Sequence, residues 1–268
     1  MVEKMQMKYA NNVCGCCNLH QVLDNTLHPG GLKLTERLAE VTLFKPGLKI
    51  LEIGCGRGIT AIFLARNYGC SVTGIDTSPA LISSARDRAE CEGMVGKTSF
   101  VIADAQELPI LSHSFDVVVC ECSLSLIPDK ERAVNEIRRV LKSGGKLTIT
   151  DLINRVDEGE SEFARTAPSP ENSIAFFPCI ENAESIEVYL ERFERAGFQN
   201  LYVEDCSQTL KEALFRMRLR FGGKDKLVQE IPCSCDGYGD EIPVRECQNF
   251  GRKSYVGYAL IAATKQEG

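Results

Sequence analysis

The sequence contains no tryptophan and only three histidines, which are His20, His28 and His113. A histidine acting as a general base must therefore be one of these three. Long apolar runs are also absent. No stretch reaches the roughly 18 residues that cross a bilayer, and the first residues, MVEKMQMKYANN, lack the apolar core of a secretory signal. We therefore expect a cytoplasmic protein without a membrane partner.

A surplus of positive charge is missing too, because the formal net charge is −6. Proteins that bind nucleic acids usually neutralise the phosphates with clustered lysines and arginines. We therefore expect no nucleic-acid partner. The hydrophobic content of 44% and the charged content of 25% are ordinary for a globular protein. The length of 268 residues allows one large, elaborated domain with a substantial core.

Thirteen cysteines are many for a reduced compartment. Their odd number, in a chain without an export signal, argues against a disulfide framework. A metal site, redox chemistry and a soft ligand stay open as explanations. Burial is another, since cysteine packs as a small apolar residue, and it is the favoured interpretation for Cys55, Cys70, Cys91 and Cys120.

Short apolar runs alternate with amphipathic segments through the middle of the chain, which is typical of βαβ units and a parallel sheet. The expected strands are 48–53, 71–76, 98–102, 115–120, 145–151, 199–205 and 254–264. The expected helices are one within 28–44, after a turn, and 58–68, 78–92, 129–141, 183–197 and 208–222.

These elements predict one elaborated α/β domain in three parts. Residues 1–47 form an N-terminal cap with a cysteine cluster, residues 48–151 form the ligand-binding core, and residues 152–268 complete the same domain. Within the last part, 152–178 is polar and rich in glutamate, proline and serine, so we expect a loop or lid there.

The stretch LEIGCGRGIT joins an expected strand to an expected helix through Gly54, Gly56 and Gly58. Glycines let the chain turn tightly and let a ligand approach the backbone. A dinucleotide fingerprint requires a glycine at the position that Ile59 occupies. Glu52 lies two positions before the first glycine, where a carboxylate disfavours a pyrophosphate and suits an ammonium group.

Two further carboxylates follow expected strands. Asp76 ends the second strand, where acidic residues accept hydrogen bonds from ribose hydroxyls. Asp104 follows the third strand, where a carboxylate can accept a hydrogen bond from an adenine amino group. The ligand expected at this edge has an amine, a ribose and an adenine, but no phosphate.

Five segments in this order resemble the S-adenosylmethionine-dependent methyltransferases: LEIGCGRG, TGIDTSPALISSAR, ADAQELP, FDVVVCECSLSLIPD and RRVLKSGGKLTITD. The resemblance covers roughly residues 48–151. It implies a Rossmann-like, doubly wound α/β fold whose mostly parallel seven-stranded sheet has an antiparallel last strand. It also implies S-adenosylmethionine as the cofactor. The cofactor-binding residues it implies are Glu52, Gly54, Cys55, Gly56, Gly58, Asp76, Thr77, Asp104, Ala105 and Glu121.

The segment CECSLSLIPDK, after the expected fourth strand, resembles the arsenite methyltransferases, in which an Asn-Cys pair in this turn supplies one thiol for trivalent arsenic. Glu121 and Cys122 occupy the matching positions, so a glutamate replaces the asparagine. The resemblance implies further thiols at Cys179 and in the N-terminal cluster, at Cys14, Cys16 and Cys17. Arsenic held by thiolates keeps a lone pair that attacks a methyl group without a base.

Other interpretations stay open at this stage. The acceptor can be another small molecule, methylated on oxygen, nitrogen or sulfur, with incidental cysteines. The chain can be a dehydrogenase, or a cysteine-rich metal-binding protein that binds the cofactor without turnover. A zinc site is a further interpretation of Cys14, Cys17, Cys233 and Cys235. His28 can approach the site from the N-terminal segment, although a structural role is favoured. The oligomeric state is not predicted.

Overall fold

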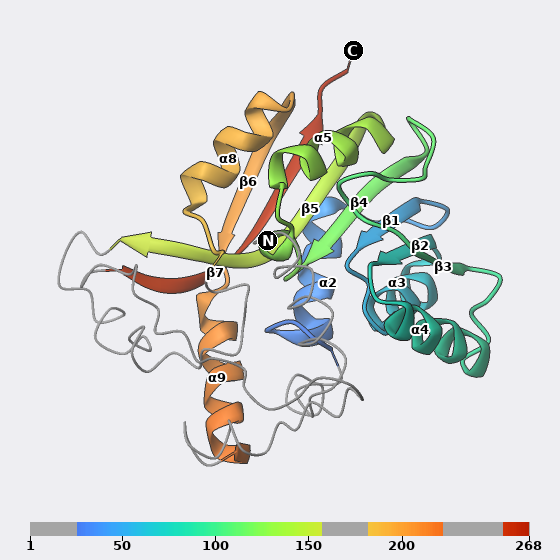
Figure 1. Ribbon diagram of the computed structural model, residues 1–268, viewed down its shortest axis with the longest axis horizontal. Coiled ribbons are helices and arrows are strands. Elements are labelled where there is room, and N and C mark those ends of the chain that lie inside the picture. Colours follow the sequence, from blue (N-terminus) through green and yellow to red (C-terminus); the bar gives the residue numbers. More distant parts are fainter. Residues whose placement is uncertain (1–25, 157–181, 222–253, 268) are drawn as a thin grey trace, which may run out of the picture.

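The computed structural model describes residues 26–156, 182–221 and 254–267 (Figure 1). Within these residues, seven strands form one sheet in the order β3-β2-β1-β4-β5-β7-β6. The strands are β1 (Lys49–Ile53), β2 (Ser71–Asp76), β3 (Thr98–Ile102), β4 (Phe115–Glu121), β5 (Leu141–Val156), β6 (Phe198–Asp205) and β7 (Ser254–Lys265). The strands from β3 to β5 are parallel, and β7 runs antiparallel to both β5 and β6. The expected mostly parallel sheet with an antiparallel last strand is confirmed.

Helices cover both faces of this sheet (Figure 1). One apolar core lies between the sheet and α2, α3, α4 and α9, and the other lies between the sheet and α5 and α8. The helices are α2 (Gly31–Thr42), α3 (Ile59–Tyr68), α4 (Pro79–Cys91), α5 (Lys130–Val140), α8 (Ile186–Arg195) and α9 (Ser207–Phe221). None of the described helices has the length and apolarity that a membrane span requires.

The core strands are apolar on both faces because helices bury both sides of the sheet. In β1, Ile50 belongs to the core under α2 and α3, whereas Leu51 and Ile53 belong to the core under α5 and α8. Side chains alternate between the faces of a strand. Glu52 therefore shares the face of Ile50, and by the same alternation Glu121 shares the face of Val119 in β4.

The fifth strand is longer than the expected 145–151, because the residues after 151 continue it. This strand begins at Leu141 and continues to Val156, paired with β7 as far as Ser254. Leu152 and Ile153 are buried in the two cores, so the polar segment that was expected to be a lid begins as a core strand. The rest of that segment lies outside the described residues.

The burial expected for four cysteines is confirmed for three of them. Cys55, Cys70 and Cys120 are buried, whereas Cys91 is exposed. Cys91 is the last residue of α4, and the apolar stripe of that helix ends at the buried Ala89. Successive helical positions are separated by about 100°, so two residues further along, the side chain points away from the sheet.

Asp151 is a buried carboxylate, only 1% exposed, on the side of the sheet covered by α5 and α8. It accepts hydrogen bonds from the backbone N–H and the hydroxyl of Ser125, at 2.8 and 2.7 Å, and from the backbone N–H of Leu152 at 2.8 Å. Burial raises the pKa of Asp151 to about 6, and these hydrogen bonds oppose the shift. Asp151 thus joins the turn after β4 to β5.

We expect Asp151 to make the stability depend on pH. Between the ordinary pKa of 3.8 and about 6, the folded state keeps a proton that the unfolded state has released, so the free energy of unfolding falls as the pH rises. The wild type should lose about 2 kcal/mol relative to Asp151→Asn between pH 4 and pH 7. Urea unfolding of both proteins at four pH values measures this difference, and parallel stability curves would contradict the assignment.

Candidate active site

The glycine loop joins β1 to α3 in a backbone conformation that side chains disfavour. Gly54, Gly56 and Gly58 have φ angles of 69°, 51° and 73°. A Cβ atom at Gly54 would lie 2.6 Å from the Cβ of Ser123, and one at Gly58 would lie 2.6 Å from Cζ of Phe100. Both the φ angles and the close neighbours require glycine here.

Glu52 is buried at the carboxyl end of β1 and is 4% exposed. The backbone N–H of Ala61, in the first turn of α3, donates to its carboxylate. Its Oε2 atom is buried without a hydrogen-bond partner. Burial raises the pKa of Glu52 well above its ordinary value, and the negative charges of Glu121 and Asp76 raise it further.

Asp76 ends β2 as expected and holds the glycine loop. Its carboxylate accepts hydrogen bonds from the backbone N–H groups of Gly56, at 3.0 Å, and Ser78, at 2.9 Å. Burial raises the pKa of Asp76, although these N–H groups and that of Thr77 oppose the shift. The Thr77 side chain itself is exposed. Asp76 therefore lies at the sheet edge where the sequence predicts a ribose site.

Asp104 lies beyond β3 and is half-buried, next to the buried Ala105. It accepts hydrogen bonds from the backbone N–H of Gln106 at 2.8 Å and from the side-chain Nε2 of Gln106 at 2.9 Å. Sequence reasoning missed Gln106. An aspartate followed two residues later by an amide side chain is a local pairing that the sequence does contain.

Glu121 is the last residue of β4, paired with Thr150, so the expectation that it lies beyond the strand is wrong. It is 8% exposed and accepts hydrogen bonds from the hydroxyls of Thr35, at 3.1 Å, and Thr60, at 3.0 Å. The Nε2 atom of His28 lies 3.4 Å from its Oε2. Sequence reasoning missed both threonines; the signal available for Thr35 was a polar residue on the apolar stripe of a helix.

Among the described residues, those of the N-terminal segment cover this site. His28 is 5% exposed beside Glu121, and Thr35 reaches the same carboxylate from α2. A Cβ atom at Gly56 would lie 3.2 Å from Cδ1 of Leu27, so this segment also approaches the glycine loop. The approach of His28 to the site, which the sequence left open, is therefore realised.

Cys122 follows β4 with a φ angle of 53°, a left-handed conformation that is uncommon outside glycine. Its backbone N–H donates to the carbonyl of Thr150 at 2.6 Å, and its side chain is half-buried. Nearby, the Tyr258 hydroxyl donates to the Thr150 hydroxyl at 3.0 Å. Cys120, in contrast, is completely buried, and burial raises the pKa of its thiol. The two cysteines of this turn thus differ in environment.

The other cysteines proposed as acceptor or zinc ligands lie outside the described residues. These are Cys14, Cys16, Cys17, Cys179, Cys233 and Cys235. Within the described ranges, no group of three histidine, cysteine, aspartate or glutamate side chains is arranged to hold a metal ion. The convergence of these thiols on Cys122 stays a prediction.

The charges of the site fit the cationic nucleoside that the sequence resemblance implies. The unpartnered Oε2 of Glu52 is buried near two further carboxylates, those of Asp76 and Glu121. An ammonium or sulfonium group offsets this negative charge, whereas a phosphate adds to it. Glu52 and the glycine loop therefore suit the amino-acid part of S-adenosylmethionine. The ribose and adenine roles of Asp76 and Asp104 stay predictions.

Comparison with known proteins places this site in context. Residues 51–149 match the family described as a methyltransferase domain. Methyltransferase GfsG of Streptomyces halstedii is 34% identical over 182 residues, which are 68% of this chain and 64% of GfsG. The 27-O-demethylrifamycin SV methyltransferase of Amycolatopsis mediterranei is 30% identical over 245 residues, covering 90% of this chain and 86% of that protein. The crystal structure of the [4+2]-cyclase SpnF has 25% identity and a TM-score of 0.67, covering 98% of this chain and 96% of SpnF.

We expect Gly54→Ala to weaken S-adenosylhomocysteine binding at least tenfold, because its Cβ atom would displace Ser123 and the loop. Gly93→Ala is the matched control, with a φ angle of 67° and no atom within 4 Å of the added Cβ. Both changes should cost stability, about 1 to 2 kcal/mol, through backbone strain. Calorimetric titration and thermal unfolding separate the two effects. Equal loss of affinity in both variants would contradict the role of the Ser123 contact.

We expect S-adenosylmethionine binding to release protons from Glu52, because burial raises the pKa of this carboxyl group in the free protein and the ligand ammonium lowers it again. Affinity should therefore rise with pH over the range in which Glu52 loses its proton, as long as the α-amino group of the ligand stays protonated. Titration in two buffers of different ionisation enthalpy measures the protons released. Glu52→Gln should bind more weakly and release none. An unchanged proton count in this variant would exclude Glu52 as the source.

Proposed function

This chain belongs to the S-adenosylmethionine-dependent methyltransferases, and from that premise we propose that it methylates a hydroxyl group of a small-molecule acceptor. The observation that carries this proposal is the pair formed by His28 and Glu121 beside the glycine loop. The relative that covers 90% of this chain is described as an O-methyltransferase by its name, 27-O-demethylrifamycin SV methyltransferase.

The reaction determines what the protein must supply. When bound, S-adenosylmethionine supplies a methyl group activated by its positive sulfur. Transfer to a hydroxyl forms a carbon–oxygen bond, breaks the carbon–sulfur bond and releases the hydroxyl proton. The protein must align the acceptor, exclude water and provide a group that takes this proton. A hydroxyl acceptor therefore requires a base near the methyl group.

His28 is suited to take that proton. Its Nε2 atom is buried without a hydrogen-bond partner, 3.4 Å from Oε2 of Glu121. A neighbouring carboxylate stabilises the imidazolium that forms when a histidine accepts a proton. The hydroxyls of Thr35 and Thr60 hold that carboxylate in place. We assign the role of general base to His28, and to Glu121 the role of stabilising the protonated histidine.

The remaining site residues bind and orient the cofactor in this proposal. Glu52 receives the ammonium group, and the glycine loop allows the amino-acid part to approach the backbone. Asp76 accepts hydrogen bonds from the ribose, and Asp104 from the adenine amino group. Because all lie at the carboxyl ends of β1, β2 and β3, a cofactor held by them would place its methyl group toward the end of β4, where Glu121 and Cys122 lie.

A trivalent metalloid is the second candidate acceptor, and the position of Cys122 favours it. Cys122 is half-buried at the exit of β4, in a left-handed backbone conformation. Such conformations often occur at functional sites. Cys179 and the cluster of Cys14, Cys16 and Cys17 would supply the other thiolates. This acceptor needs no base, so the two candidates differ in their dependence on His28.

Methyl transfer is tested with S-adenosylmethionine labelled in its methyl group. The acceptors are hydroxyl compounds including 27-O-demethylrifamycin SV, amines of similar size, and arsenite with a thiol reductant. We expect O-methyl products, and we expect His28→Ala to lower kcat about 100-fold or more, since a positioned base contributes that much. Binding of S-adenosylhomocysteine should change less than threefold in this variant, which separates catalysis from cofactor affinity.

The same assay separates the alternatives. Label only in methylated arsenic, lost in Cys122→Ser and kept in the exposed-cysteine control Cys91→Ser, would select the metalloid. Label only in amines, or full O-methylation by His28→Ala, would contradict the proposed base. Cofactor binding without transfer to any acceptor would contradict the proposed reaction, because a shared fold does not guarantee a shared reaction and SpnF is described as a cyclase.

A further inference from the structure

A cluster of basic side chains lies at the end of the sheet opposite the glycine loop, where the parallel strands begin. It surrounds a cleft of about 750 Å³ between the start of β4, the ends of α5 and α8, and the end of β7. No aspartate or glutamate is among the residues that line it, although the whole chain carries a net charge of −6. The basic side chains lining this cationic cleft are His113, Arg138, Arg139, Arg195 and Lys265.

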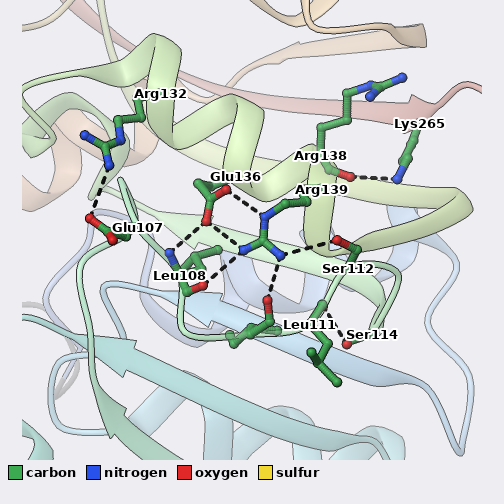
Figure 2. A network of polar contacts seen from close by, with 11 residues as sticks. Glu107, Leu108, Leu111, Ser112, Ser114, Arg132, Glu136, Arg138, Arg139 and Lys265 are labelled. Carbon is green, nitrogen blue, oxygen red and sulfur yellow. Dashed lines mark hydrogen bonds and ion pairs between the residues drawn. The ribbon is translucent and has the colours of Figure 1, made fainter.

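Two of these cations are neutralised by neighbouring carboxylates. Figure 2 shows the guanidinium of Arg139 paired with Glu136, whose two oxygens lie 2.7 Å from its nitrogens. Arg195 lies 3.3 Å from a carboxylate oxygen of Glu131. These ion pairs compensate the charges of Arg139 and Arg195, so neither side chain requires a ligand.

Lys265 has hydrogen bonds but no carboxylate. It is 5% exposed, and its ammonium donates to the carbonyl of Arg138 at 2.8 Å (Figure 2) and to that of Leu141 at 2.6 Å. These carbonyls lie at the C-terminal end of α5, where a cation is favoured. Burial lowers the pKa of Lys265, and the charge of Arg138 lowers it further. Capping the helix explains its position and compensates part of its charge.

Arg138 lies in the last turn of α5, where a cation is favoured, but no carboxylate among the described residues pairs with it. Within the described residues no ion pair involves it, and its Nε atom is buried without a hydrogen-bond partner. Its guanidinium lies against Gly197, where a Cβ atom would be 3.0 Å from Nε and 3.3 Å from Nη2. An anion in the cleft would supply the charge partner that the described residues do not give this half-buried arginine.

His113 adds a hydrogen-bond donor beside these two cations. The ammonium of Lys265 lies 3.4 Å from its Nδ1 atom. Because an ammonium only donates, Nδ1 accepts and the ring hydrogen of the neutral form is on Nε2. The backbone of His113 has a φ angle of 57° and donates to the carbonyl of Arg139 at 3.0 Å, which fixes this exposed residue at the cleft.

We propose that the cationic cleft binds the dianionic phosphate group of a small molecule. Arg138, which has no carboxylate partner among the described residues, offers its planar guanidinium, and His113 offers its imidazole N–H to the phosphate oxygens. Lys265 adds positive charge nearby, although its three N–H groups face two carbonyls and the ring of His113. The volume of about 750 Å³ exceeds what a free phosphate fills and lies within the range of small-molecule sites. The site lies at the opposite sheet edge from the proposed methyl transfer, so it is independent of that reaction.

Calorimetric titration of the full chain tests this site with inorganic phosphate, glycerol 3-phosphate and glycerol at constant ionic strength. We expect both phosphates to bind and glycerol not to bind. Tighter binding of the ester identifies a phosphorylated molecule as the ligand, and equal or tighter binding of inorganic phosphate identifies the free anion. Arg138→Gln should weaken binding about tenfold or more.

Arg132→Gln is the matched control, because Arg132 lies on the same helix and pairs with Glu107 outside the cleft (Figure 2). It should leave phosphate binding unchanged. His113→Asn is a second test that avoids the core, since asparagine tolerates a left-handed backbone, and it should weaken binding severalfold. S-adenosylhomocysteine affinity reports that each variant is folded. No saturable phosphate binding by the wild type, or equal weakening by Arg132→Gln, would overturn the proposal.

Discussion

Several carboxylates are buried at the carboxyl ends of the parallel strands, and the rest of the site depends on this constraint. Glu52, Asp76 and Glu121 lie near one another on the same edge, and their charges together raise the pKa of Glu52. Removing carboxylates from water is unfavourable unless donors or cations compensate them. Backbone N–H groups compensate Asp76, and the first turn of α3 partly compensates Glu52. The charge that is left selects a cationic ligand.

The N-terminal segment completes this compensation from outside the sheet. Thr35 and His28 reach Glu121 from α2 and the turn before it, and Thr60 reaches it from α3. These contacts join residues that are 86 and 61 positions apart in the chain. The same segment therefore stabilises a buried carboxylate, covers the glycine loop and brings the one described histidine of this edge to the site. Structural and catalytic roles for His28 do not exclude each other.

The two edges of the sheet carry opposite charges because of how parallel strands and helices are arranged. The carboxyl ends of the strands meet the N-terminal end of α3, where backbone N–H groups favour carboxylates. The amino ends meet the C-terminal ends of α5 and α8, where carbonyls favour cations such as Lys265. The helix ends account for part of the positive charge, and Arg138, in the last turn of α5, has no carboxylate partner among the described residues. The net charge of the chain is negative and does not reveal that the two ends of the sheet carry opposite charges.

Much of the fold follows from local patterns: apolar runs, helical periodicity and the glycines with positive φ all act within a few residues. The seven strands and the positions of Glu52, Asp76 and Asp104 were therefore predictable, whereas the antiparallel last strand was implied by the resemblance to methyltransferases. The length of β5 was not predictable, because its continuation after residue 151 is held by pairing with β7, about 100 residues away. Sequence alone thus determined where the strands lie, to within a few residues, and which carboxylates follow β1, β2 and β3. Only the tertiary structure decided that Thr35, Thr60 and His28 meet Glu121, and that Arg138 and Lys265 share a cleft, since burial and charge compensation depend on neighbours distant in the chain.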